Sequence, residues 1–231
     1  MFDPRAERLE ILDGTLYDER FAERCYRFMA RVNRFLGGAR VVRRFLEEEV
    51  AAAPGRPLRV LDIGAGACDI PLAVARWARR RGLDLAITCL EPAPLAARIA
   101  RRNLARAGLS GLRLLEEDVF AHQPSRPYDC AIGSMFFHHL RDDEIVRLVE
   151  HLRRIVRRSV LLNDLRRTAL HFAGAVLLTA LACPGLRHDA LVSIRRGFRV
   201  ADLQRTLGRI HAGSLRVENA WLFRIRAIVQ F

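Results

Sequence analysis

The 231-residue sequence predicts an α/β fold built on a mostly parallel sheet that ends in an antiparallel hairpin. From residue 58 onward, short apolar runs alternate with longer amphipathic runs, which is typical of βαβ units with right-handed crossovers. Residues 214–231 instead alternate apolar and polar side chains, as the strands of a hairpin do. Hydrophobic residues make up 51% of the chain, which is enough for a core and too much for a disordered protein.

The first 55 residues predict a helical cap that precedes the sheet-forming core of residues 56–231. Apolar residues recur with helical spacing from Tyr17 to Leu36, and Gly37 ends that pattern. A second helix is expected from Ala39 to Ala53, because a Pro-Gly pair follows it.

The core predicts alternating strands and helices. The expected strands are Leu58–Ile63, Asp84–Leu90, Leu112–Glu116, Tyr128–Gly133 and Ser159–Asn163. The expected helices are Ile70–Arg80, Pro94–Ala107 and Asp142–Val156. This order places the carboxyl ends of the strands at one edge of the sheet, which is where open α/β sheets bind ligands.

The remainder of the core predicts a lid, a helix and the hairpin. The segment from about Arg166 to Gly197 is expected to form a helical lid inserted into the core, and Val200–Leu207 a further helix. Two strands within Ser214–Phe231 are expected to turn near Asn219 to Trp221. Their alternation places apolar side chains on one face, and on the other face Arg216, Glu218, Arg224 and Arg226.

The charge balance is strongly basic, since 39 Lys and Arg, all of them Arg, stand against 26 Asp and Glu for a formal net charge of +13. Such basicity indicates a nucleic acid, an anionic membrane or an acidic ligand as a partner. The arginines are spread through the chain, so the charge alone leaves these partners open.

Cysteine usage and the N-terminus predict a cytoplasmic protein with no metal site. The five cysteines stand far apart, with no Cys-x-x-Cys pair and no histidine at zinc-ligand spacing. The N-terminus is charged where a signal peptide is apolar. The apolar run Ala169–Cys183 is shorter than the roughly 20 residues of a membrane span. Peripheral contact of this run with a membrane stays open, as does the oligomeric state.

A glycine turn follows the first strand. Asp62, Gly64 and Gly66 form an Asp-x-Gly-x-Gly motif, whose glycines let the backbone bend tightly and approach a ligand closely. Asp69 stands where a dinucleotide fingerprint needs its third glycine, which argues against NAD. Asp69 is then either a helix N-cap or a ligand contact. An acid, Glu91, closes the second strand 25 residues after Gly66.

Asp118-Val119 follows the third strand, and Ser134 follows the fourth. Together with the glycine turn and Glu91, they resemble the motifs of class I S-adenosylmethionine-dependent methyltransferases over about residues 58–231. The resemblance implies a Rossmann-like sheet of seven strands and S-adenosylmethionine as the cofactor. It also implies that Glu91 holds the ribose hydroxyls and that Asp118 and the Val119 N–H bind adenine. Asp62, near the end of the first strand, is implied to contact the positively charged end of the cofactor. The implied cofactor contacts are Asp62, Gly64, Ala65, Gly66, Glu91, Pro92, Asp118, Val119 and Ser134.

Four short segments resemble, more narrowly, small bacterial methyltransferases that act on polyketide-derived phenols or quinones. They are Asn33–Gly38, Ser134–Leu140, Asn163–Arg167, and His188-Asp189 with Ser193–Arg196. This resemblance implies natural-product biosynthesis and O-methylation of a phenolic or polyketide-derived small molecule. C-methylation of a quinone-type acceptor is the near alternative.

Methyl transfer requires alignment of donor and acceptor, worth up to about 7–11 kcal/mol, and removal of the acceptor proton, worth roughly 10²- to 10⁴-fold. The candidate bases are His138, which we prefer, and His139, with Asp164 near enough to orient the ring. A neutral imidazole accepts a hydroxyl proton near pH 7. The alternative is that these histidines line the cofactor pocket or cap the next helix. His188 and Arg195 are expected to bind an acidic or phenolate acceptor.

Two other functions stay open from the sequence. A nucleic-acid methyltransferase would suit the charge, but enzymes that methylate base amino groups place Asp or Asn, Pro-Pro and an aromatic residue where this chain has Ser134–Phe137. A protein or cyclase that binds S-adenosylmethionine without transferring its methyl group would share the cofactor motifs.

Overall fold

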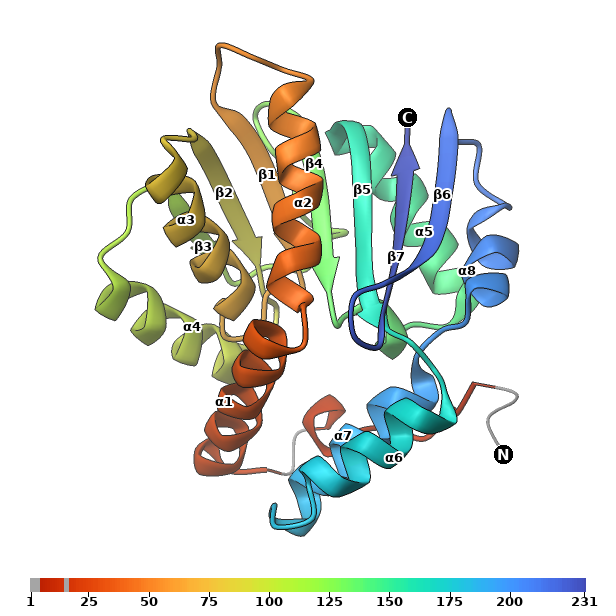
Figure 1. The fold of residues 1–231 in the computed structure, drawn as a ribbon. Coiled ribbons are helices and arrows are strands. Elements are labelled where there is room, and N and C mark those ends of the chain that lie inside the picture. Colours follow the sequence, from red (N-terminus) through yellow and green to blue (C-terminus); the bar gives the residue numbers. More distant parts are fainter. Residues whose placement is uncertain (1–4, 15–16) are drawn as a thin grey trace.

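The computed structural model describes residues 5–14 and 17–231, so residues 1–4 and 15–16 of the expected cap lie outside the described part. Its centre is a seven-stranded sheet in the order β3-β2-β1-β4-β5-β7-β6 (Figure 1). The strands are β1 (Leu58–Ile63), β2 (Leu85–Leu90), β3 (Leu112–Leu115), β4 (Tyr128–Ser134), β5 (Val156–Leu165), β6 (Ser214–Ala220) and β7 (Arg224–Gln230). The helices are η1 (Ile11–Asp13), α1 (Glu19–Phe35), α2 (Gly38–Ala51), α3 (Asp69–Arg81), α4 (Pro94–Ala107), η2 (Phe137–His139), α5 (Asp142–Ile155), α6 (Ala169–Leu178), α7 (Pro184–Arg196) and α8 (Val200–Leu207).

The sheet is parallel except for β7, which runs antiparallel to both β5 and β6. The predicted Rossmann-like α/β fold with a terminal antiparallel hairpin is confirmed. β1 lies between β2 and β4, so the strand order reverses at β1. Ligands bind at such a switch point in open α/β sheets, which places the glycine turn after β1 at the expected crevice.

Helices cover both faces of the sheet and bury the core between the layers. One face packs against α2 and α3 through side chains that include Phe45, Leu46 and Trp77. The other face packs against α5 and α8 through side chains that include Leu148 and Leu203. Figure 1 shows α2 in front of the sheet and α5 behind it.

The N-terminal segment and the segment between β5 and α8 meet at the carboxyl edge of the parallel strands (Figure 1). The first contributes η1 and α1, and the second contributes α6 and α7. Helix α7 contacts both η1 and α1. The backbone N–H of Ala6 donates to the carbonyl of Arg195 at 3.1 Å. Two segments far apart in sequence therefore close over the strand ends that carry the cofactor motifs.

Several element boundaries differ from those expected, among them the starts of β5 and α3. β5 begins at Val156, directly after α5 and before the expected Ser159, because the buried Val156 pairs with Tyr128 of β4. Helix α3 begins at Asp69, and its N-cap is Cys68 with a φ of 59°. The N-cap interpretation of Asp69 was therefore wrong.

The hairpin also requires a correction. β6 extends through Ala220, so the turn lies at 221–223 and not at Asn219 to Trp221. The expected polar face of the second strand is wrong, since Arg224 and Arg226 are only 1% and 8% exposed. β7 lies between β5 and β6 inside the sheet, where both of its faces are covered.

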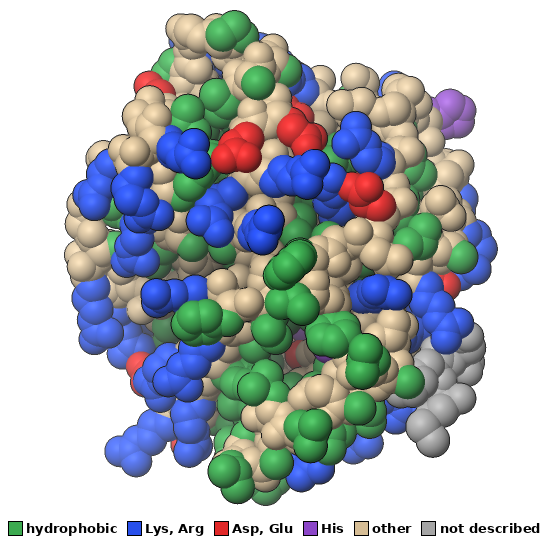
Figure 2. Space-filling view, viewed as in Figure 1, with side chains coloured by type: hydrophobic (Ala, Val, Ile, Leu, Met, Phe, Trp, Pro, Cys, Tyr) green, Lys and Arg blue, Asp and Glu red, His purple; other side chains and the backbone are tan. Residues whose placement is uncertain are grey.

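Basic and apolar side chains occupy different parts of the surface. Figure 2 shows arginine side chains concentrated over α2, α3 and α4. A groove of about 740 Å³ in this region is lined by arginines on α1, α2, α3 and α4, namely Arg27, Arg34, Arg43, Arg76, Arg80, Arg102 and Arg106. Helix α6 instead exposes apolar side chains, among them Leu170 and Leu177. No helix in the described part of the chain is long and apolar enough to cross a membrane.

Candidate active site

The glycine turn after β1 has a backbone geometry that requires glycine. Gly64 and Gly66 have φ values of 61° and 53°, a left-handed conformation that glycine adopts without strain. A Cβ atom on Gly64 would lie 2.3 Å from the ring of Phe136, and one on Gly66 would lie 3.2 Å from the ring of Tyr26. The turn therefore has no room for a side chain at Gly64, and a ring from α1 lies against Gly66.

Glu91 joins this turn to the end of β2. Its carboxylate accepts hydrogen bonds from the backbone N–H groups of Gly66 at 2.7 Å and Ala93 at 2.9 Å. Burial raises the pKa of Glu91, and the two hydrogen bonds offset part of the rise. A carboxylate offers about four lone-pair sites, so acceptor capacity remains for ligand hydroxyls. The position fits the ribose contact that the resemblance implies.

A buried polar network lies around the turn. Asp62 is 2% exposed, and its pKa is raised well above the ordinary value by burial and by the negative charges of Asp69 and Glu91. Asn33 donates to Asp69 at 2.9 Å and accepts from Arg224 at 2.6 Å. A ligand with a positively charged end would reduce the cost of burying these carboxylates. The carboxylates of Asp62, Asp69 and Glu91 therefore fit the positively charged end of S-adenosylmethionine.

The residues expected at the adenine follow β3. Asp118 is exposed, and its carboxylate accepts from the backbone N–H of Phe120 at 2.8 Å. Val119 is buried beside it. The carboxylate of the preceding Glu117 lies 3.0 Å from Nδ1 of His122.

The other expected cofactor residues also lie at strand ends. Ala65 donates its backbone N–H to the carbonyl of Leu90 at 3.0 Å, which ties the glycine turn to β2. Pro92 is exposed in the loop after β2. Ser134 ends β4, and its hydroxyl accepts from the side-chain amide of Asn163 at 2.9 Å. The fold thus brings the expected cofactor residues to one edge of the sheet.

His138 is held between two carboxylates. Its Nδ1 lies 2.7 Å from Oδ1 of Asp164, and its Nε2 lies 3.3 Å from Oε1 of Glu10. Ionised carboxylates only accept, so this geometry favours a ring with a proton on each nitrogen. Burial lowers the pKa of His138, but the charges and hydrogen bonds of Asp164 and Glu10 outweigh burial and raise it to about 9. The surroundings of His138 thus do not favour the neutral imidazole that the sequence led us to expect.

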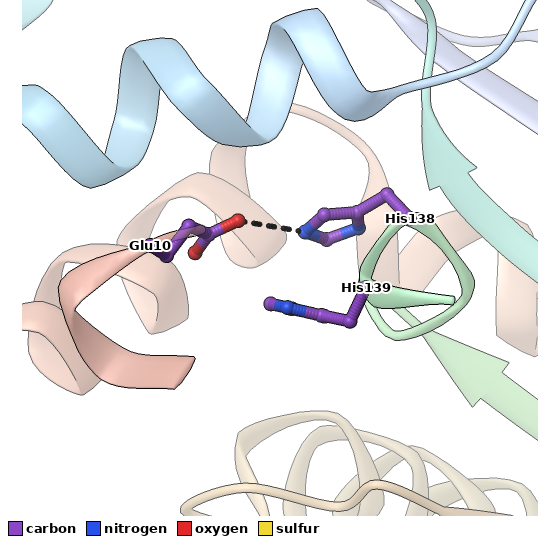
Figure 3. A group of neighbouring side chains, drawn as sticks. All are labelled: Glu10, His138 and His139. Atoms are coloured by element: carbon purple, nitrogen blue, oxygen red, sulfur yellow. Dashed lines mark ion pairs between the residues drawn. The ribbon is translucent and has the colours of Figure 1, made fainter. Parts of the chain in front are cut away.

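His139 is the more accessible of the two imidazoles. Its side chain is 29% exposed, against 1% for His138, and its Nδ1 lies 2.6 Å from Oδ1 of Asp13. The guanidinium of Arg196 donates to the carbonyls of both histidines and to Oδ2 of Asp13. Figure 3 shows Glu10 facing the two imidazoles from the N-terminal segment.

An apolar cavity of about 290 Å³ opens beside this cluster, between α1 and the pair α6 and α7. Met135 after β4 and Leu165 at the end of β5 lie in its wall, so the cavity reaches the strand ends. Figure 2 shows hydrophobic side chains gathered around the hollow between α1 and α6. Burial lowers the pKa of the lining residue His171 to about 4, so its ring is neutral. The apolar lining includes Phe28, Met29, Val32, Ala175, Leu178 and Leu186.

The two residues expected to bind the acceptor lie outside the described lining of this cavity. His188 is half-buried and Arg195 is exposed, both on α7. Helix α7 instead presents Leu186, Asp189 and Ser193 to the cavity, at a spacing that belongs to one helix face. His188 and Arg195 lie on a different face of the same helix.

Three residues of the site were not anticipated from the sequence. Glu10 and Asp13 belong to a segment that carries two carboxylates three residues apart among apolar residues, and that spacing was the available signal. Arg224 and Arg226 alternate with apolar residues along β7, so the pattern placed both on a polar face and gave no sign that Arg224 belongs to the site.

The methyltransferase motifs have a counterpart in comparisons with known proteins. Residues 60–159 match the family model of a methyltransferase domain. A search of the curated proteins found no match to this chain.

Solved structures share the fold over most of the chain. The plantazolicin methyltransferase BpumL, in complex with SAH, has a TM-score of 0.70 at 12% identity, covering 94% of this chain and 91% of that one. A SAM-dependent methyltransferase from Aquifex aeolicus has a TM-score of 0.63 at 14% identity, covering 93% and 98%. The magnesium protoporphyrin IX methyltransferase from Synechocystis PCC 6803, with bound SAH, has a TM-score of 0.54 at 16% identity, covering 84% and 82%. The fold of this chain is thus that of these solved methyltransferases, and residues 60–159, which include the glycine turn joined to Glu91, match a methyltransferase domain.

Proposed function

We propose that this protein transfers the methyl group of S-adenosylmethionine to an oxygen atom of a small, largely apolar acceptor that is phenolic or polyketide-derived. The observation that carries the proposal is the apolar cavity at the strand ends, beside the histidine cluster. A cavity of about 290 Å³ with a few polar groups in an apolar wall is suited to a small molecule. Such a wall is unsuited to a polyanion, so the basic surface does not make nucleic acid the preferred acceptor.

The polar groups of the wall favour an acceptor that donates a hydrogen bond. They are Glu10, Asp189, Ser193 and the neutral His171. Ser193 donates its hydroxyl hydrogen to Glu10 at 2.7 Å, so the wall presents mainly acceptor atoms. A hydroxyl group would complement it, whereas an anionic acceptor would face two carboxylates. We therefore replace the acidic acceptor expected from the sequence by a neutral one that carries a hydroxyl.

Proton removal is assigned to His139 in this proposal. Its Nδ1 is oriented by Asp13, which leaves Nε2 as the basic nitrogen, and its side chain is accessible where that of His138 is not. The cofactor supplies a methyl group on a sulfonium, so the acceptor oxygen forms the new C–O bond while the C–S bond breaks and its electron pair stays on sulfur. The hydroxyl proton passes to Nε2 of His139, and His138 with Asp164 positions the loop that carries His139.

The test uses purified protein, methyl-labelled S-adenosylmethionine and a panel of alkylresorcinols, alkylpyrones and hydroxyquinones. We expect label in at least one product, attached to oxygen as shown by fragmentation in mass spectrometry. Turnover on an amine or a carbon acid, with none on any phenol, would remove the oxygen assignment. Cofactor binding without turnover on any acceptor class would favour a binding protein.

A further inference from the structure

Glu10, His138 and His139 form a cluster of side chains of the types that hold a transition-metal ion. The ligand atoms that they offer all lie within 4.8 Å of one another. Figure 3 shows Glu10 reaching the two imidazoles from a separate segment, so the three groups approach one point from two sides. Two histidines and one carboxylate are a common ligand set for first-row divalent ions.

Both imidazoles are oriented as metal-binding histidines are. Nδ1 of His138 lies 2.7 Å from Asp164, and Nδ1 of His139 lies 2.6 Å from Asp13. Metal-ligating histidines almost always donate their other ring N–H to a carboxylate, a carbonyl or water, which fixes the ring and raises its basicity. Here each ring has its own carboxylate at Nδ1, so each Nε2 is the remaining ligand atom. This arrangement is a second observation, independent of the proximity of the three groups.

The charges around the cluster also favour a cation. Three carboxylates, those of Glu10, Asp13 and Asp164, contact the two imidazoles. Arg196 pairs with Oδ2 of Asp13, and the charges of Arg5 and Arg224 act on Asp164. Glu10 instead pairs with the ring of His138, so with neutral imidazoles a divalent ion would offset the charge of Glu10.

We propose that Glu10, His138 and His139 bind one divalent first-row transition ion of the Zn²⁺ class, with the carboxylates of Asp13 and Asp164 orienting the two imidazoles. Ligand atoms at about 2.0–2.1 Å from a tetrahedral ion lie roughly 3.4 Å apart, and Oε1 of Glu10 and Nε2 of His138 are already 3.3 Å apart. The ligand atom of His139, within 4.8 Å of the other two, would close by at most about 1.4 Å, and its ring is the more accessible one. Three protein ligands leave one position open for water or for an acceptor oxygen.

The open position would face the acceptor cavity, since Glu10 lies in the cavity wall. An acceptor hydroxyl bound to the ion would lose its proton more readily, because a metal ion lowers the pKa of a bound hydroxyl. In the ion-bound protein His139 would be a ligand, so the ion would replace it as the activating group and the hydroxyl proton would pass to solvent water. Metal binding itself does not rest on the proposed function, because it is measured without S-adenosylmethionine and without a methyl acceptor.

The experiment titrates metal-free protein with Zn²⁺ by calorimetry and with Co²⁺ by visible absorption, which reports coordination by nitrogen and oxygen ligands. We expect one equivalent of either ion and a rise in the unfolding temperature with added Zn²⁺. Glu10→Gln and His139→Ala should each weaken binding at least tenfold. Asp13→Asn should weaken it about 10- to 100-fold by releasing the ring of His139.

His211→Ala is the matched control, because His211 is exposed and outside the cluster. It should bind Zn²⁺ and Co²⁺ as the wild type does. The wild type failing to bind either ion would overturn the proposal. So would unchanged binding in Glu10→Gln and His139→Ala, since the ion would then sit elsewhere, for example on a cysteine. Circular dichroism of each variant separates loss of the site from loss of the fold.

Discussion

Nδ1 of His138 lies 2.7 Å from Oδ1 of Asp164, and both side chains are 1% exposed. Asp164 also accepts hydrogen bonds from the backbone N–H groups of His138 at 3.1 Å and Leu165 at 2.7 Å. The pair joins η2 to the end of β5. On the far side of the ring, Glu10 of the N-terminal segment contacts Nε2 of His138. The His138–Asp164 pair and its contact with Glu10 thus hold together η2, the end of β5 and the N-terminal segment, and the last two of these line the apolar cavity.

Asp164→Asn is expected to destabilise the fold by about 3–5 kcal/mol, because removing one partner of a buried pair leaves the other charge without compensation. Asp143→Asn is the control, since Asp143 pairs with Arg209 at the surface with a side chain that is 77% exposed. An exposed pair contributes about 1 kcal/mol or less. Urea unfolding at pH 7 measures the free energy of unfolding of both variants. Equal losses in the two variants would show that the Asp164 pair contributes no more than a surface pair.

Glu91→Gln is expected to weaken binding of S-adenosylmethionine about 10- to 100-fold, because hydrogen bonds to a charged group contribute about 1.5–3 kcal/mol. Calorimetric titration with S-adenosylmethionine and S-adenosylhomocysteine measures the change. Glu116→Gln is the control, since Glu116 pairs with Arg101 away from the turn and should bind both ligands normally. Unchanged affinity in Glu91→Gln would remove Glu91 from the cofactor site.

Gly64→Ala is expected to destabilise the fold and abolish cofactor binding, because its Cβ would lie 2.3 Å from the Phe136 ring. Gly82→Ala separates this clash from backbone strain. Gly82 has a similar φ of 64°, but a Cβ there would meet no atom within 4 Å. The left-handed backbone costs roughly 1–2 kcal/mol in either variant, and the clash adds about 1–3 kcal/mol in Gly64→Ala. Thermal and urea unfolding measure the difference, and equal losses would contradict the clash.

His171 predicts a loss of stability in mild acid. Its pKa is lowered to about 4 in the folded protein by burial, from an ordinary value of 6.5. As the pH falls, the unfolded chain therefore binds a proton at His171 before the folded protein does. The contribution of His171 to the free energy of unfolding is complete above about pH 6.5 and declines toward pH 4. The slope is at most about 1.4 kcal/mol per pH unit. Urea unfolding at pH 7, 6 and 5 should show a shallower decline in His171→Gln than in the wild type or in the exposed control His211→Gln. Parallel declines in all three would refute the assignment.

The fold was largely readable from the sequence because its signals are local. The alternation of apolar and amphipathic runs defines the parallel strands and the helices that connect them. The glycine turn and Glu91 were also readable, since each directly follows a strand whose carboxyl end must lie at the ligand edge. The 2.7 Å hydrogen bond from the backbone N–H of Gly66 to Glu91 is possible because both strands end at that edge.

The parts that were missed depend on long-range packing. Glu10 contacts His138 from a segment far earlier in the chain, and no periodicity in the sequence predicts that contact. Arg224 was placed on a polar face because alternation cannot distinguish an edge strand from one covered on both faces. His188 and Arg195 were chosen by residue type, whereas the rotation of α7 decides which of its side chains face the cavity.

Filling the cavity tests the central claim, that the acceptor is a small apolar molecule bound between α1 and α6. Gly174 lines the cavity, and a Cβ there would meet no atom within 4 Å, so Gly174→Leu adds bulk without a clash at its first atom. Ala173→Leu, an exposed change on the same helix and outside the described lining, is the control. The measurement is methyl transfer from labelled S-adenosylmethionine to the best phenolic acceptor, with cofactor affinity determined in parallel. We predict that Gly174→Leu raises the acceptor KM at least tenfold with unchanged cofactor affinity, while Ala173→Leu behaves as the wild type. Equal acceptor KM values in all three proteins would contradict the account.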